Sequence, residues 1–169
     1  MGKFKVRVSL PRNCWNQDQA NILMHATQFY AKAILGTRLA NLCKVNLKVR
    51  KTTLDGSTLG ECRMQVTGSK RQRKFEIVLN DKRDLHAKLQ TLAHEMIHVK
   101  QKAKDELRYS WDSKNCLIMI RWKDNAPVKH NEIPYRERPW EIEAKQNERI
   151  YYKKYLDYVY QNKKEANNE

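Results

Sequence analysis

The stretch LHAKLQTLAHEMIHVK, residues 85–100, decides the fold of this chain. Its apolar residues recur every three or four positions, as they do in a helix that buries one face: Leu85, Leu89, Leu92, Met96 and Val99. Asp84, directly before the stretch, is a good N-cap residue. The sequence therefore predicts an amphipathic helix that begins after Asp84 and packs against a core.

The same helix contains His94-Glu95-Met96-Ile97-His98, an H-E-x-x-H motif. The two imidazoles lie one turn apart and off the buried stripe, where both can bind one metal ion, and the glutamate can accept a proton from a metal-activated water. A pair of histidines that lines a cleft and binds nothing is the alternative. Because Glu95 occupies the position that the motif requires, we expect a Zn²⁺ site with His94 and His98 as ligands.

A catalytic zinc site normally takes three protein ligands, so a third is needed elsewhere in the chain. The acidic stretch Glu132–Glu148 offers candidates, and Pro139 suits the first turn of a second long helix. Glu141 and Glu143 lie near the beginning of that helix, where its dipole favours carboxylates even without a metal. His130 is a further candidate, in a segment that we expect to be a loop.

The pairing of HEMIHVKQ with PWEIEA resembles the gluzincin branch of the zinc metallopeptidases, in particular small single-domain SprT-like or phage-encoded forms. The resemblance covers roughly residues 75–150. In such families the third ligand is a glutamate on the helix after the H-E-x-x-H helix, often with an alanine three residues later. Glu141 with Ala144 matches that context, and Glu143 is the closest rival. The resemblance implies a zincin-like α+β fold, in which a small mixed sheet has a backing helix, the motif helix and a C-terminal helix with the third ligand.

Residue patterns outside the motif also predict an α+β chain. Alternating residues predict four strands, at Lys3–Leu10, Val45–Arg50, Gly60–Thr67 and Lys74–Leu79. Helices are expected at Asp18–Leu35 and from Pro139 to about Tyr160, and Arg108–Trp122 has a strand-like core within a loop-rich stretch that runs to Pro139. We predict one domain over residues 1–162 and a polar C-terminal tail over residues 163–169. The tyrosines near the C-terminus could stack on nucleobases, but we favour packing onto the domain.

The chain is strongly basic, with 34 Lys and Arg against 19 Asp and Glu, a formal charge of +15. Nine basic residues and one acidic residue fall within the first 50 positions. Such a surface attracts polyanions, so non-specific contact with DNA or RNA is expected beside a peptide or protein substrate.

The four cysteines form no C-x-x-C pair, and all four are expected to be small buried residues: Cys14, Cys43, Cys62 and Cys116. The first ten residues, MGKFKVRVSL, do not resemble a signal peptide, and no apolar run is long enough for a membrane span. These features favour a cytoplasmic protein that does not enter a membrane. The oligomeric state is left open.

The function expected from the motif is peptide hydrolysis, with Glu95 as general base. The oxyanion of the reaction needs a hydrogen-bond donor, and Tyr135, His130 and Tyr109 are candidates. One alternative is a hydrolase like peptide deformylase, in which a cysteine such as Cys62 would be the third ligand. A second alternative is a basic nucleic-acid-binding protein whose zincin core is structural or catalytically silent.

Overall fold

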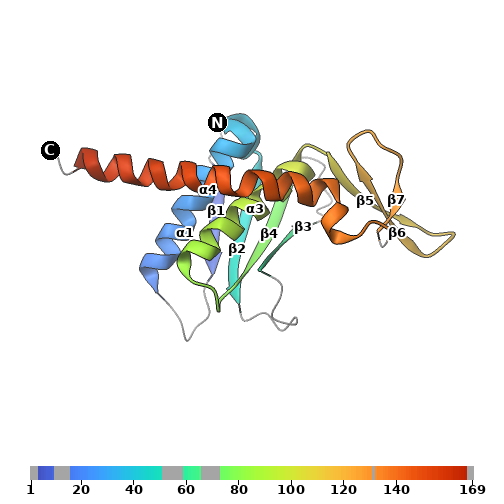
Figure 1. Ribbon diagram of the computed structural model, residues 1–169, viewed down its shortest axis with the longest axis horizontal. Coiled ribbons are helices and arrows are strands. Elements are labelled where there is room, and N and C mark those ends of the chain that lie inside the picture. Colours follow the sequence, from blue (N-terminus) through green and yellow to red (C-terminus); the bar gives the residue numbers. More distant parts are fainter. Residues whose placement is uncertain (1–3, 10–15, 51–58, 66–72, 131, 167–169) are drawn as a thin grey trace.

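The structure is a computed structural model that describes residues 4–9, 16–50, 59–65, 73–130 and 132–166. Its main sheet has the strand order β1-β2-β4-β3 (Figure 1). β1, β2 and β4 are parallel, whereas β3 is antiparallel to β4 and forms one edge. The bounds are β1 Lys5–Ser9, β2 Cys43–Arg50, β3 Gly60–Gln65 and β4 Arg73–Asn80. All four predicted strands are therefore present; positions 3, 10, 66 and 67 lie outside the described residues.

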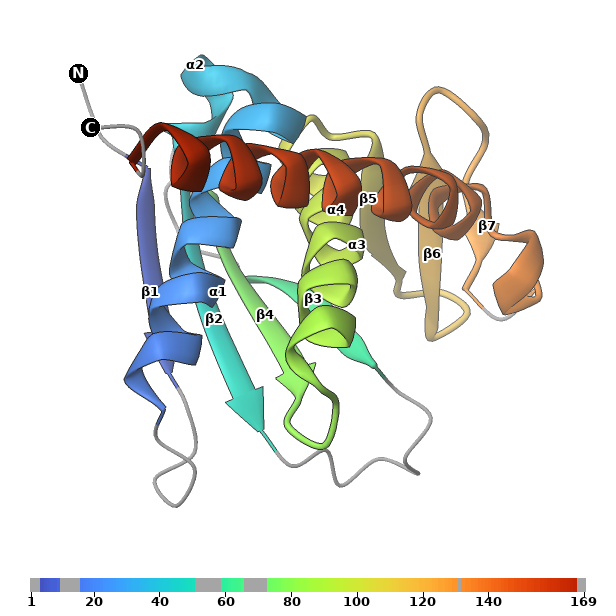
Figure 2. The same ribbon diagram turned by 60° about the vertical axis from the view of Figure 1, so that its left-hand side comes forward.

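Two helices lie side by side on one face of this sheet (Figure 2). α1 (Gln17–Tyr30) begins after Asn16, whose side chain accepts two backbone N–H groups. α3 (Leu85–Ala103) begins after Asp84, whose carboxylate accepts the N–H of Ala87 at 2.7 Å. This confirms the predicted N-cap, and it fixes where the motif helix begins.

The first helical segment is longer than expected. α1 passes directly into a π-helical turn, Ala31–Leu35, and then into the short helix α2 (Gly36–Ala40). Gly36 has a φ of 74°, which a residue with a side chain would adopt only with strain. The predicted helix Asp18–Leu35 is therefore correct in place, although its last turn is not α-helical.

The core lies between the sheet and α1 and α3. Every second residue of β2 is buried, from Cys43 to Val49, and these side chains face the helices. The predicted stripe of α3 faces them in turn: Leu89, Leu92, Met96 and Val99 are at most 4% exposed. Burial of this stripe sets the direction of every other side chain on α3.

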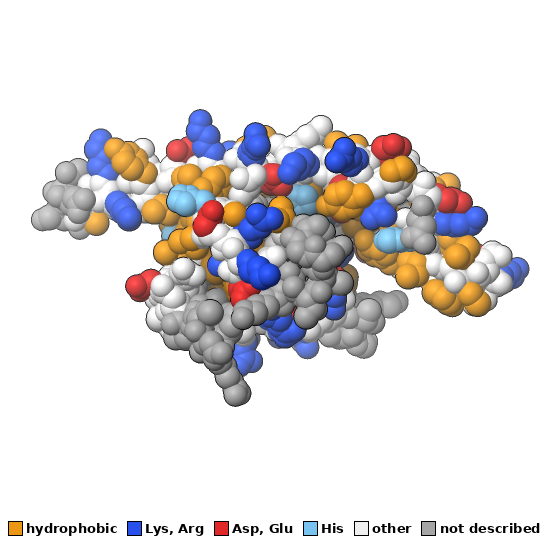
Figure 3. Space-filling view, turned by 60° about the horizontal axis from the view of Figure 1, so that its bottom comes forward, with side chains coloured by type: hydrophobic (Ala, Val, Ile, Leu, Met, Phe, Trp, Pro, Cys, Tyr) orange, Lys and Arg blue, Asp and Glu red, His pale blue; other side chains and the backbone are white. Residues whose placement is uncertain are grey.

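A second, antiparallel sheet projects from one end of the body, in the order β5-β6-β7 (Figure 1). Its strands are β5 (Leu107–Asp112), β6 (Leu117–Trp122) and β7 (Val128–Lys129). The predicted strand-like core is confirmed as β6, and the stretch from there to Pro139 is mostly loop, as expected. The expectation was wrong for residues 107–112, where LRYSWD alternates apolar and polar residues and pairs with β6 as β5. Figure 3 shows hydrophobic side chains gathered at this end, and Trp111 is 62% exposed.

The long helix α4 (Pro139–Ala166) crosses over α1 and α3 (Figure 2). The predicted helix end near Tyr160 was wrong, since α4 continues to Ala166 and includes the first four residues of the predicted polar tail, 163–169. Lys, Glu and Ala favour helix, and no Gly or Pro interrupts them. Residues 167–169 lie outside the described residues. Packing of the tyrosine cluster is confirmed for Tyr155, which is 3% exposed against α1, whereas Tyr160 is 66% exposed.

Two of the cysteines are buried as expected, Cys43 and Cys62. Cys116 is exposed, contrary to expectation, because it lies in the turn between β5 and β6 with a φ of 53°. Cys14 lies outside the described residues. None of the described helices has both the length and the apolar character needed to cross a bilayer.

Candidate metal centre

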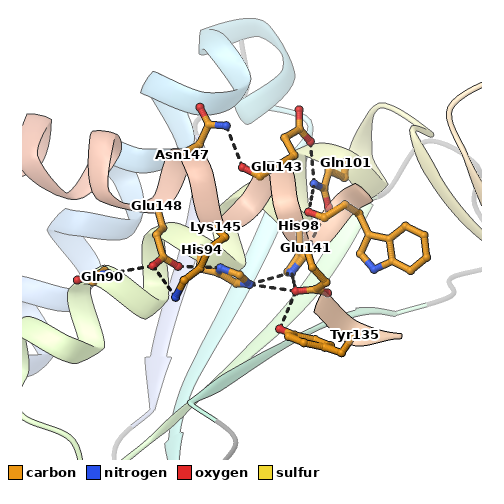
Figure 4. Close-up of polar contacts among 11 residues, drawn as sticks. Gln90, His94, His98, Gln101, Tyr135, Glu141, Glu143, Lys145, Asn147 and Glu148 are labelled. Carbon is orange, nitrogen blue, oxygen red and sulfur yellow. Dashed lines mark hydrogen bonds and ion pairs between the residues drawn. The ribbon is translucent and has the colours of Figure 1, made fainter. Parts of the chain in front are cut away.

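Three ligand atoms converge between α3 and the beginning of α4: Nε2 of His94, Nε2 of His98 and Oε2 of Glu141 (Figure 4). The two nitrogens are 3.2 Å apart, and Glu141 Oε2 lies 3.4 Å from that of His94 and 3.5 Å from that of His98. A tetrahedral ion with bonds of about 2.0–2.1 Å holds its ligand atoms about 3.3 Å apart. The three groups could therefore hold a metal ion in the arrangement that the structure already has.

The other nitrogen of each imidazole is fixed by a hydrogen bond. Nδ1 of His94 donates to Oε2 of Glu148 at 2.9 Å, and Nδ1 of His98 donates to Oε1 of Gln101 at 2.7 Å. Carboxylates only accept, so the proton of the first bond belongs to His94. Since both Nδ1 atoms donate, Nε2 is on each ring the atom left to bind a metal, once any proton on it is displaced.

Gln101 is completely buried and determines the second of these bonds. Its Nε2 donates to the carbonyl of Trp140 at 2.9 Å and to Oε2 of Glu143 at 2.7 Å (Figure 4). Because both partners are acceptor oxygens, this end of the amide is its NH2 group, and the end that faces His98 is the oxygen. An amide oxygen only accepts, which assigns the proton to Nδ1 of His98. Glu143 also accepts from Lys100 at 2.8 Å. Glu143, the rival third ligand, is thus engaged away from the convergent group.

The carboxylates and the imidazole of His94 shift one another's pKa. Burial opposes the charged form of all three groups, but hydrogen bonding outweighs it. Bonds with Glu141 and Glu148 raise the pKa of His94 to about 9. Bonds from His94, Gln90 and Lys145 lower the pKa of Glu148 to about 2. The pKa of Glu141 is lowered as well, by His94 and His98. The site therefore stabilises a positive charge between anionic groups.

Glu95 is the motif residue that does not join the convergent group. It is 5% exposed, and this burial raises its pKa, while the neighbouring His98 and His94 lower it in part. Its carboxylate lies close to Gly60 of β3. A Cβ at Gly60 would lie 2.9 Å from Oε1 of Glu95 and 2.6 Å from Cγ2 of Thr91. A side chain at this position would require Thr91, Glu95 or the strand itself to shift.

The three candidate oxyanion donors are placed differently. Tyr135 reaches the site, because its hydroxyl donates to Oε2 of Glu141 at 2.7 Å. Tyr109 lies at the margin, where burial and the charge of Glu141 raise the pKa of its phenol. His130 follows β7, its backbone N–H donates to Ile118, and it does not belong to the convergent group.

The alternative that resembles peptide deformylase requires Cys62 as the third ligand, but Cys62 does not belong to the convergent group of His94, His98 and Glu141. It lies on β3, and burial raises the pKa of its thiol to about 12, away from the thiolate that binds metals. Its carbonyl instead accepts a hydrogen bond from Nζ of Lys102.

Sequence reasoning missed three residues that shape this site: Glu148, Gln101 and Gly60. Glu148 had a signal, since it lies seven residues after Glu141 and so on the same face of α4. Gln101 lies three residues after His98, within reach of its ring. No pattern in the sequence indicated Gly60, because its close approach to α3 depends on the packing of the whole sheet.

Comparison of the chain with family models, with curated proteins and with solved structures found no match in any of the three. The function must therefore be inferred from the geometry of the site.

Proposed function

We propose that the protein is a zinc-dependent peptidase of the zincin type, with His94, His98 and Glu141 as metal ligands. The observation that supports this proposal most directly is that Nε2 of His94, Nε2 of His98 and Oε2 of Glu141 lie 3.2–3.5 Å from one another, so no backbone rearrangement is needed to bind an ion. Two imidazoles and one carboxylate are a donor set that suits Zn²⁺ and leaves a position for water.

Zinc bound at this site would lower the pKa of a water molecule toward neutrality and polarise the carbonyl of the scissile peptide. Glu95 then acts as general base: it accepts a proton from the attacking water and later gives it to the leaving amine. Its raised pKa makes the carboxylate a stronger base than an exposed glutamate. Its position against Gly60 holds it in one place for both transfers.

The edge strand β3 would bind the substrate backbone. The carbonyl of Leu59 accepts the N–H of Asn80 on β4, so the backbone groups of Gly60 and Cys62 point away from β4, to the open edge. An extended peptide can add to such an edge by main-chain hydrogen bonds. Lys102 donates to the carbonyl of Cys62, and a bound peptide would compete with it there.

Tyr135 is the candidate that we favour as oxyanion donor. Its hydroxyl already lies at a ligand oxygen, and its side chain is 59% exposed, so it can turn toward a bound substrate. Donation from a phenol at this point stabilises negative charge that develops on the carbonyl oxygen. Tyr109, on β5, is the second candidate.

Metal analysis and peptide hydrolysis test the proposal together. We expect one zinc per chain in the wild type and in Glu143→Ala, and none in Glu141→Ala. Glu95→Gln should keep its zinc but lose roughly 10²–10⁴-fold in kcat on a peptide library, because only the proton acceptor is removed. Full hydrolysis by zinc-loaded Glu95→Gln would refute the general-base role.

A further inference from the structure

In Figure 2, α1, α3 and α4 lie on one face of the main sheet, and the opposite face carries a row of basic residues. The register places Lys5 of β1 opposite Lys44 of β2, and Lys44 opposite Lys74 of β4. Residues that are opposite in register share a face, so three ammonium groups form one row across three strands. Arg7 lies two positions after Lys5, on the same face. The row crosses the beginnings of the strands, on the side of the sheet away from the metal centre.

This row borders a hollow in the surface of about 230 Å³. Lys5, Arg7, Lys44 and Lys74 line it, together with Asn46 and Gln65. The hydrophobic residues Val6, Val45 and Phe75 also border it, and the side chains of Val45 and Phe75 are buried in the core. All charged groups that line the hollow are therefore basic, which favours an anion.

The acidic residues of the same face are already paired. Glu76 binds Lys48, and Glu61 binds Arg63 at 2.5 Å. For Lys5, Arg7, Lys44 and Lys74, no ion pair occurs with any residue in the described part of the chain. Like charges directly opposite one another on a sheet repel, so this row lowers the stability of the fold. A bound polyanion would offset that cost.

We propose that this row, Lys5, Lys44, Lys74 and Arg7, binds the phosphodiester backbone of a nucleic acid. Neighbouring strands are about 4.8 Å apart, so the three lysines span about 10 Å and can contact successive phosphates of one strand. The described residues of this face include no aromatic side chain, so bases have nothing to stack on. Binding is therefore independent of sequence, through backbone charge alone.

The composition of the face favours nucleic acid over a lipid surface. Binding at a membrane interface usually combines basic groups with apolar side chains that enter the acyl boundary. Around the row, the outward positions in register are polar or charged: Asn46, Gln65, Glu76 and Arg63. This inference goes beyond peptide hydrolysis, since none of its residues contacts the metal centre.

The test measures binding of a labelled oligonucleotide, single-stranded and duplex, by fluorescence anisotropy at several salt concentrations. For three or four phosphate contacts on a single strand, log Kd should change with log[salt] with a slope of roughly 2–3. The variant Lys44→Gln with Lys74→Gln should reduce that slope by about 1.4 and weaken binding about tenfold or more at low salt. Its melting temperature should stay unchanged or rise, because like charges are removed.

The matched control is Lys153→Gln with Lys164→Gln, which removes the same charge from exposed positions of α4. It should bind nearly as the wild type does. If both double variants lost the same affinity for the oligonucleotide, binding would depend only on net charge, and the proposal would be overturned. Displacement of the oligonucleotide by inorganic phosphate at equal phosphate concentration, or tighter binding of polyglutamate or of anionic vesicles through the same lysines, would also overturn it. Zinc content and hydrolysis, measured in parallel, should not change, so this proposal and that of a peptidase can fail separately.

Discussion

Nδ1 of His94 donates a hydrogen bond to Oε2 of Glu148 at 2.9 Å, and Glu148 lies on α4 two turns beyond the proposed ligand Glu141. One helix thus supplies both a proposed ligand and the carboxylate that orients the imidazole of another. A carboxylate behind a metal-bound imidazole keeps its tautomer and raises its basicity.

Replacing Glu148 with Gln should therefore weaken zinc binding by about 10–100-fold, while the fold is kept. Competition with a chromophoric chelator measures the affinity. Asp157→Asn, an exposed acid on the same helix, is the control and should bind zinc as the wild type does. Equal affinities of Glu148→Gln and the wild type would show that the bond does not orient the ring.

A methyl group at Gly60 should damage catalysis more than metal binding. The Cβ of Gly60→Ala would meet Thr91 and Glu95, so β3 must move or Glu95 must turn away. We expect a loss of about 1–3 kcal/mol in the free energy of unfolding, from overpacking, and a fall in kcat with zinc retained. Adding Thr91→Ser removes the nearest methyl group and should restore part of the stability. If Gly60→Ala is as stable and as active as the wild type, the close approach does not constrain the site.

Zinc binding should release a proton near neutral pH. The pKa of His94 is about 9 in the metal-free protein, so its imidazole is protonated at pH 7 and zinc must displace that proton. Calorimetry in buffers with different ionisation enthalpies should give close to one proton per zinc at pH 7, and less as the pH rises through 9.

The same shift acts on the stability of the metal-free fold. A pKa raised from 6.5 to about 9 stabilises the fold fully below pH 6.5, and this stabilisation is lost as the pH rises through 9. Urea unfolding of the chelator-treated protein across this range measures the loss. Glu148→Gln should shrink both effects, because it removes one of the bonds that raise this pKa. For the predicted proton release, a heat of zinc binding that is the same in every buffer would contradict the prediction.

The described cysteines should differ in their rate of alkylation. Cys116 is exposed, whereas burial raises the pKa of Cys43 to about 11 and that of Cys62 to about 12. Iodoacetamide at pH 8 should label Cys116 in the native protein and the two buried thiols only after unfolding, as peptide mass mapping can follow. If removal of zinc alone exposed Cys62 to labelling, a role of Cys62 at the metal would have to be reconsidered.

Much of the fold could be predicted because it is encoded locally. The stripe of α3 and the alternation of β2 are set by which side chains are apolar, and a local pattern reports that directly. The pairing of His94 with His98 is also local, since it depends only on the rise of a helix. Glu141 required one step more, the expectation of a third ligand. For that reason Glu143 stayed an alternative to Glu141 as third ligand until the structure showed that Glu143 accepts hydrogen bonds from Lys100 and Gln101.

What could not be predicted depends on contacts between distant elements. Gln101 is a polar residue in the last part of a helix, where exposure is the usual outcome, yet it is buried because α4 crosses there. Strand β5 was missed although Tyr109 and Trp111 alternate with polar residues; it pairs only with β6, and these two side chains are 50% and 62% exposed. The row of Lys5, Lys44 and Lys74 is visible only after the register is known.

The amide of Gln101 links His98 on α3 to the carbonyl of Trp140 on α4. We therefore expect metal binding at the site to be coupled to the packing of α4 on α3. Because Trp140 is 3% exposed and lies at that junction, its part of the emission from the four tryptophans should shift to the red when a chelator loosens the contact, and Trp140→Phe should lose that shift. Intrinsic tryptophan fluorescence would then report metal binding without an added dye.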